Sequence, residues 1–335
     1  MTSRRRGPAM SRRDTLVAGA LLASRLHWPA HGQEISARRR VGVLHVPSAG
    51  INVRTEALRQ GMRELGWVEG KNVEYLFAFA DGDVTRLDAL ARKLIAQRAE
   101  VIVCSSGVST RVLQRATKTI PIVMVTVANP VANGFVASLA RPGGNVTGLS
   151  NQQEDVLGKL VDLLHELVPA AQRIAVLVNE NNPSQAALWA AAQRACAALR
   201  LAPTRVVASA PEQLAGAVAQ ITSQRAQAVV VIADPMYTNE LERIHALMLP
   251  ARLPVAYGLR EHVAVGGLLS YGVNFTEQWR HAAKFVDRIL NGARPADLPV
   301  EQPTRFELVI NLKAARALGI TIPRSLLLRA DEVIE

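Results

Sequence analysis

From residue 40 onward, short and continuously apolar runs alternate with longer amphipathic segments, and this alternation constrains the fold more than any other feature of the sequence. The first run, 41–46, is followed by a segment, 52–66, whose apolar residues recur at helical spacing. Continuous apolar strands are typical of sheets covered on both faces, so we predict a parallel sheet wrapped by helices and joined by right-handed crossovers. Further strand-like runs occupy 73–79, 101–104 and 122–127, with helical segments at 84–97 and 108–117.

The same cycle of strand and helix recurs in the second half of the chain. Ordered matches of this kind predict an α/β protein of two Rossmann-like lobes, each a parallel sheet flanked by helices. The alternative is coincidence, because buried parallel strands are all rich in Val and Ile. The matching segments are 40–44 with 173–177, 98–103 with 225–230, and 120–123 with 253–256.

Two glycine-bearing segments mark the expected passages between the lobes. Residues 141–149 should lead from the first lobe to the second, and 266–272 should lead back. A helix expected at 275–290 comes too late to complete the repeat of the second lobe, so we assign it to the first. A hinge that the chain crosses several times would let the two lobes close on a ligand. The predicted organisation is a first lobe of 40–147 plus 274–297, a second lobe of 148–270, and a third crossing with the tail in 298–335.

The first 32 residues have the order of regions that marks a signal peptide. Five arginines among residues 4–13 precede an apolar run, 15–23, and small residues follow up to Gly32. The run is far shorter than the roughly 20 residues that a membrane-spanning helix needs. Arg12 and Arg13 leave the twin-arginine export route open beside the general secretory one. We expect cleavage after Gly32 and a periplasmic protein; the alternative is a disordered basic leader.

The excess of basic side chains does not indicate a nucleic-acid surface. The net charge is +11, but the first 32 residues contain six Arg and one Asp and so carry +5 of it. Cys104 and Cys196 each lie inside an apolar segment, which argues against a disulfide framework and against a cysteine-based metal site. We therefore expect no nucleic-acid partner and no metal.

Polar residues follow the strands of both expected lobes. In open α/β sheets a ligand binds beyond the carboxyl ends of the strands, so these residues form the candidate site. For each Ser, Asn or Asp taken singly, helix capping is the alternative explanation. The candidates are Ser48, Ser105, Ser106, Thr126 and Asn129 in the first lobe, and Asn181, Asp234, Tyr257 and Tyr271 in the second.

Taken together, these side chains suggest a zwitterionic ligand, namely an amino acid with a bulky apolar side chain. Hydroxyls and amides at helix starts can hold a carboxylate, so the serines are assigned that role. Asp234 is expected to face the ammonium group, and the two tyrosines are expected to flank the side chain.

Motifs of the common enzyme classes do not occur in the sequence. No glycine-rich phosphate loop follows the first strand, and there is no G-x-S-x-G nucleophile elbow. The histidines beyond residue 40 are not spaced as metal ligands. We expect a binding protein that uses no cofactor, rather than an enzyme.

Three segments carry a resemblance to a known family: 61–72 (GMRELGWVEGKN), 139–148 (LARPGGNVTG) and 306–313 (FELVINLK). From about residue 40 to the C-terminus, the chain resembles the tryptophan/tyrosine-type family of ABC-transporter substrate-binding proteins. The resemblance implies a type I periplasmic-binding-protein fold and a monomer that delivers a small-molecule ligand to an ABC permease in the inner membrane. Characterised members of this family take aromatic amino acids. The alternative is a periplasmic ligand-sensing module for a membrane receptor.

Overall fold

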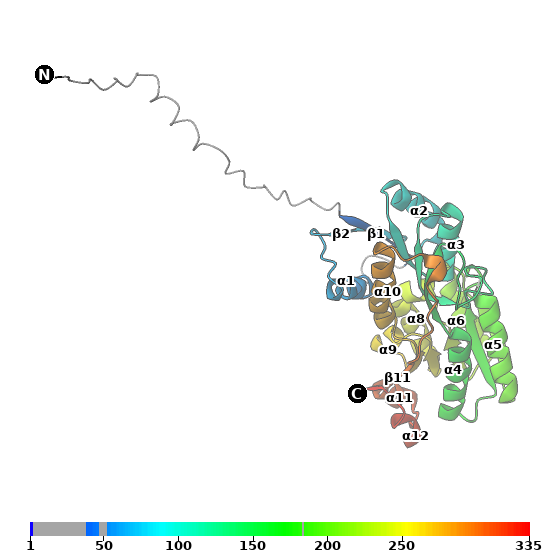
Figure 1. Ribbon diagram of the computed structural model, residues 1–335. Coiled ribbons are helices and arrows are strands. Elements are labelled where there is room, and N and C mark those ends of the chain that lie inside the picture. The colour runs from blue at the N-terminus through cyan, green and yellow to red at the C-terminus, as the bar shows by residue number, and fades with distance from the viewer. Residues whose placement is uncertain (3–37, 47–51, 183) are drawn as a thin grey trace. The chain divides into compact units, whose positions relative to one another are not determined.

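Two β-sheets, each covered by helices on both faces, make up the folded part of the chain (Figure 1). The computed structural model describes residues 1–2, 38–46, 52–182 and 184–335, so the predicted signal peptide lies outside the described residues apart from its first two. The first sheet has the order β2-β1-β3-β4-β5, and all its neighbouring strands are parallel. Its strands are β1 (Arg39–His45), β2 (Val73–Phe79), β3 (Val101–Ser105), β4 (Ile122–Ala128) and β5 (Val146–Asn151).

Side chains of the first sheet pack into two apolar layers, one on each face. Val41 and Val43 pack with α1 (Asn52–Glu64) and α10 (Phe275–Leu290), whereas Leu44 points to the other face and packs with helices α2 (Leu87–Ala96) and α3 (Gly107–Ala116). Helices α1 and α10 approach closely because residue 61 is a glycine: a Cβ there would lie 2.4 Å from the backbone oxygen of Arg280. The late helix α10 therefore packs on the first sheet.

The second sheet has the order β12-β11-β10-β9-β8-β6-β7 and is parallel except for the pair β10–β11. Its apolar layers lie between the sheet and α4, α5, α11 and α12 on one face, and α6 and α8 on the other. The strands are β6 (Arg173–Val178), β7 (Ala202–Val207), β8 (Ala228–Val231), β9 (Val255–Tyr257), β10 (Leu269–Gly272), β11 (Glu307–Asn311) and β12 (Glu332–Ile334). The helices are α4 (Gln153–Leu167), α5 (Gln185–Ala198), α6 (Leu214–Ser223), α7 (Pro235–Asn239), α8 (Leu241–Met248), α9 (Glu261–Ala264), α11 (Leu312–Leu318) and α12 (Arg324–Leu327).

The passages between the two lobes differ in detail from the expected boundaries. The first passage lies after Asn151 rather than at 147, because β5 still pairs with β4 through Ser150 and Asn151. The expected tail contributes β11 and β12 to the second sheet. Strand β11 is antiparallel to β10 because the chain leaves the sheet at the end of β10 and re-enters it from the same side.

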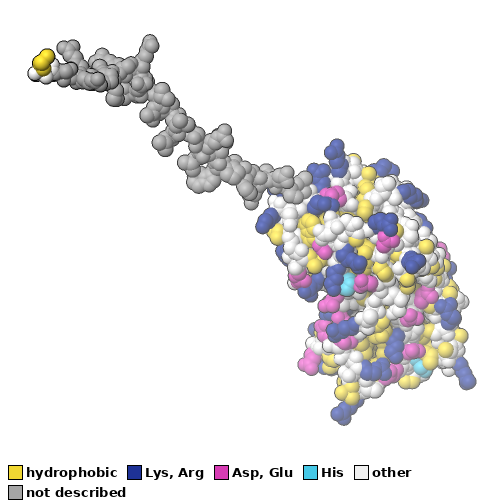
Figure 2. Space-filling view, in the orientation of Figure 1, with side chains coloured by type: hydrophobic (Ala, Val, Ile, Leu, Met, Phe, Trp, Pro, Cys, Tyr) yellow, Lys and Arg dark blue, Asp and Glu magenta, His cyan; other side chains and the backbone are white. Residues whose placement is uncertain are grey.

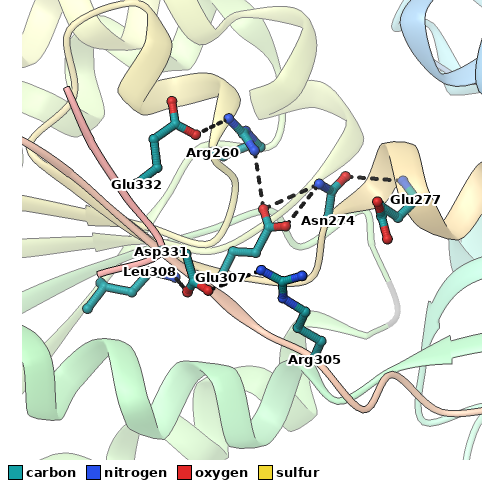
Figure 3. A network of polar contacts seen from close by, with 8 residues as sticks. All are labelled: Arg260, Asn274, Glu277, Arg305, Glu307, Leu308, Asp331 and Glu332. Atoms are coloured by element: carbon teal, nitrogen blue, oxygen red, sulfur yellow. Dashed lines mark hydrogen bonds and ion pairs between the residues drawn. The ribbon is translucent and has the colours of Figure 1, made fainter. Parts of the chain in front are cut away.

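A network of polar contacts joins the second and third passages (Figure 3). Asn274 accepts a hydrogen bond from the backbone N–H of Glu277 at 3.1 Å, which caps α10, and its amide donates to both carboxylate oxygens of Glu307 at 3.1 and 3.3 Å. Arg260 donates to Glu307 at 3.2 Å and also contacts Glu332. The chain that enters α10 is thus fixed to the chain that returns to the second lobe.

Basic and acidic side chains are mixed on the surface of the folded part. On the face shown in Figure 2, Lys and Arg are interspersed with Asp and Glu. Many arginines have acidic partners; Arg280, for example, lies 2.8 Å from Glu64, and Arg63 lies 2.8 Å from Glu56. Within the described ranges, no helix is both long enough and apolar enough to cross a membrane.

Candidate ligand-binding site

The carboxyl ends of strands from both sheets surround a small cavity of about 40 Å³ between the lobes. The first lobe contributes Ser105, Ser106 and Thr126, and the second contributes Asn182 and Asp234. A cavity of this size holds a few water molecules, so a larger ligand requires the lobes to separate. The other lining residues are Arg54, Gly107, Ala128, Gln153, Ser184, Ala233, Pro235, Thr238 and Phe275.

The two serines lie where β3 ends and α3 begins. Ser106 has a φ of +80°, and its hydroxyl accepts a hydrogen bond from the backbone N–H of Ser109 at 3.4 Å, which caps α3. The hydroxyl oxygen of Ser105 lies 3.1 Å from Nδ1 of His45. Ser106 therefore caps α3 and also lines the cavity. The positive end of the α3 dipole points toward the cavity, which suits an anionic group.

Thr126 lines the cavity with the two serines, and its backbone is strained. Its φ is +58°, which is unfavourable for a β-branched residue. The pairing of β4 with β5 shifts register between Met124 and Val127, and the amide of Asn151 donates to the backbone oxygen of Thr126 at 2.8 Å. Such strain tends to be stored at binding sites.

Asp234 is the buried carboxylate of the second lobe. Its oxygens accept hydrogen bonds from the amides of Asn179 and Asn182 at 3.0 and 2.8 Å, and from the backbone N–H of Met236 at 2.9 Å. The last contact caps α7. Burial raises the pKa of the Asp234 carboxyl, and the hydrogen bonds from the two asparagines oppose the rise. Asp234 therefore caps a helix and faces the cavity as well.

Arg54, in the first turn of α1, is a cavity residue that sequence reasoning missed. Its side chain is only 4% exposed, and its Nη2 donates to Oε1 of Glu261 in the second lobe at 2.7 Å. The guanidinium carbon lies 5.1 Å from the centre of the Phe275 ring, within range of a cation–π interaction. In the sequence, only its position shortly after β1 points to Arg54 as a site residue. That position is weak evidence, because many arginines of this chain lie in helices.

His45 lies behind Ser105 and is fully buried in β1. Its ring meets that of Trp279 edge-on at 5.0 Å between centres. Burial, helped by the positive charge of Arg54, lowers the pKa of His45 to about 3. A histidine with so low a pKa is a poor general base, so its contact with Ser105 does not make that hydroxyl a nucleophile.

Two further candidates, Asn181 and Asn129, do not line the small cavity. Ser48 lies outside the described residues. Asn181 lines a neighbouring cavity of about 390 Å³ that shares Asp234 with the small one. Asn129 donates to Glu154 at 3.1 Å and does not line either cavity.

The two tyrosines line neither of these two cavities. Tyr257 is buried and stacks on His262 at 4.6 Å between ring centres, and Tyr271 stacks on Phe306 at 5.8 Å. Both side chains leave their strands toward a face of the sheet, not toward its end. The aromatic ring that does line the small cavity belongs to Phe275.

The profile of a family described as ABC transporter substrate binding protein matches residues 41–334. A tyrosine-binding protein of Clostridioides difficile is 23% identical over 261 residues, which cover 78% of this chain and 75% of that protein.

Two solved structures are similar over nearly their whole length. A conserved domain protein from Vibrio cholerae has a TM-score of 0.84 and 28% identity, with 88% of this chain and 99% of that chain covered. An ABC domain in complex with L-Trp from Streptococcus pneumoniae has a TM-score of 0.84 and 26% identity, with 89% and 100% covered.

Proposed function

Because this chain belongs to the ABC transporter substrate binding protein family, we propose that it captures an aromatic amino acid between its lobes and delivers it to an ABC permease of the inner membrane. Its fold is that of type I periplasmic binding proteins, and its relatives are binding proteins rather than enzymes. The ligand class is supported by the relative named for tyrosine binding and by the similar structure solved with L-Trp. We propose that the protein acts as a monomer.

The chemistry of the small cavity is the observation that carries this proposal. The first lobe presents the Arg54 cation, the start of α3 and the Phe275 ring, and the second lobe presents the Asp234 carboxylate. An amino acid carries the complementary groups, since its carboxylate suits Arg54 and the helix start, and its ammonium group suits Asp234. A ligand held from both lobes binds the closed state better than the open one, which is what drives closure.

We expect L-tryptophan or L-tyrosine to bind the purified protein in isothermal titration calorimetry. The variant Asp234→Asn should weaken that binding by about 30-fold or more, because the ammonium group would lose its charged partner in a partly dry cleft. Asp162→Asn, an exposed change on α4, is the matched control and should bind as the unchanged protein does.

Two results would contradict the proposal at different points. Failure of both amino acids to bind would reject the ligand class, and mass spectrometry of any molecule that copurifies would then identify the true one. Unchanged affinity in Asp234→Asn would remove Asp234 from the site and leave the ligand class standing.

We further propose that residues 1–32 direct export to the periplasm, where the ligand is collected. Cell fractionation should find the protein in the periplasm with its N-terminus at Gln33, and a full-length cytoplasmic protein would contradict this. Deletion of the gene should abolish uptake of the labelled amino acid. Unchanged uptake together with a lost transcriptional response would favour a sensing module instead.

A further inference from the structure

Within the described residues, the ion pair between Arg54 and Glu261 is the one that joins the two lobes. Arg54 belongs to α1 on the first sheet, and Glu261 begins α9, which packs beside β10 and β11 of the second sheet. Nη2 of Arg54 lies 2.7 Å from Oε1 of Glu261, and the two side chains are only 4% and 25% exposed. The pair therefore bridges the lobes in a largely dry environment.

This contact exists only while the two lobes lie close together. The small cavity that Arg54 lines has room for a few water molecules, so an amino acid enters only when the lobes separate. Arg54 moves with the first sheet and Glu261 with the second, so a rotation that admits the ligand carries their charged groups apart. The closed arrangement of the lobes thus contains an ion pair that the open arrangement lacks.

Glu261 acts on the cavity from behind Arg54. Arg54 lines the small cavity, whereas Glu261 does not. The pair uses one carboxylate oxygen and Nη2, and Nε of Arg54 has no hydrogen-bond partner in the part of the chain that the structure describes. A guanidinium group presents five donors, so Arg54 can hold Glu261 and still face a ligand. Glu261 can therefore influence a bound ligand without touching it.

No other charge takes the place of either partner. Neither Arg54 nor Glu261 has a second ion-pair partner among the described residues. Burial is the main cause that lowers the pKa of the nearby His45 to about 3 and that of His262 to about 4, so both rings are uncharged at neutral pH. Burial also opposes ionisation of Glu261, but the charge and the hydrogen bond of Arg54 outweigh it and keep the pKa of Glu261 below its ordinary value. Loss of Glu261 would leave the Arg54 cation of the closed protein without an ion-pair partner, which is unfavourable in a dry site.

We propose that the Arg54–Glu261 pair is a latch: it forms when the lobes close on the ligand, and it prolongs the time for which the ligand is held. Glu261 is then a positioning residue, because it acts through Arg54 and stabilises the closed state alone. This inference rests on the proposed function only in that a ligand is captured between the lobes.

A permanent structural pair is the competing explanation, and it predicts a different ligand-free protein. Such a pair would hold the lobes together at all times, so its loss would let them move apart even without ligand. A latch that forms on closure leaves the ligand-free protein as it was. Small-angle X-ray scattering should therefore give the same radius of gyration for ligand-free Glu261→Gln and for the ligand-free unchanged protein. A larger radius in Glu261→Gln would overturn the proposal, whatever the ligand is.

The second measurement follows the bound ligand, with L-tryptophan or L-tyrosine as the probe. In surface plasmon resonance, Glu261→Gln should release the amino acid about tenfold faster and bind it at a rate within about twofold of the unchanged protein, because the latch forms after entry. Glu56→Gln, which removes an exposed partner of Arg63 inside the first lobe, is the matched control and should change neither rate. Unchanged release by Glu261→Gln would overturn the latch.

A double-mutant cycle shows whether the two residues act as one unit. By calorimetry, Arg54→Gln should weaken binding by about 30-fold or more, because the ligand carboxylate loses its cation and the latch is lost as well. Adding Glu261→Gln to Arg54→Gln should then weaken binding by less than about twofold. Losses that simply multiply would overturn the pairing. Failure of both amino acids to bind the unchanged protein would instead contradict the proposed ligand class, and the ligand-free radii would still test the latch.

Discussion

Two buried histidines should make the protein sensitive to acid. Burial is the main cause that lowers the pKa of His45 to about 3 and that of His262 to about 4. Each pKa lies below the value of about 6.5 in the unfolded chain, so the unfolded state binds more protons as the pH falls through this window. Both histidines therefore contribute stability that is complete above about pH 6.5 and is lost as the pH falls toward the folded values.

The free energy of unfolding should accordingly fall by about 4 kcal/mol between pH 7 and pH 5, with half of the loss from each histidine. Urea denaturation at the two pH values measures it. His45→Gln should remove about half of the difference. If the pH dependence of stability is unchanged in His45→Gln, His45 is not a source of the loss of stability in acid.

Single residues of the site could be predicted only where chain connectivity places them. Ser105, Ser106 and Asp234 follow strands, and parallel strands end at one edge, so the sequence alone predicts their meeting at the cavity. The position of Tyr257 could not be predicted in this way. The direction of a side chain at a strand end depends on its exact register, and a difference of one residue turns it to the opposite face.

At the scale of elements, α1 can pack closely against α10 because residue 61 is a glycine, which has no side chain. A Cβ on residue 61 would lie 2.4 Å from the backbone oxygen of Arg280 and 2.8 Å from Cβ of Ala283. Gly61→Ala should therefore destabilise the protein by about 1–3 kcal/mol in urea denaturation, despite the better helix propensity of Ala.

Gly158→Ala in α4 is the matched control, because a Cβ there meets no atom within 4 Å. It should stabilise the protein by up to about 1 kcal/mol, since Ala is the better helix former. Equal effects of the two substitutions would show that the helices do not approach as closely as described.

Long elements could be predicted from periodicity, and short ones could not. The continuous apolar runs became buried strands of the first sheet, and the segment from 275 became α10. The three residues of β12 are too few to show a period, and the antiparallel direction of β11 follows from the route of the chain rather than from its composition.

At the scale of the whole molecule, the two lobes should unfold together. Trp279 and Phe285 of α10 complete the core of the first lobe, yet the chain reaches them only after it has formed most of the second. If the second lobe unfolded alone, the first lobe would have to hold the two ends of a long flexible loop together, which costs conformational entropy. Urea transitions followed by far-ultraviolet circular dichroism and by tryptophan fluorescence should coincide, and two separate transitions would contradict this expectation.

The late position of α10 also affects the protein while it is being made. At the usual speed of translation, the segment 152–274 takes on the order of ten seconds to synthesise. During that time the face of the first sheet that carries Val41 and Val43 has no α10 to cover it. The part of this face that α10 covers therefore stays exposed, and accessible to chaperones, until the ribosome has reached the last fifth of the chain.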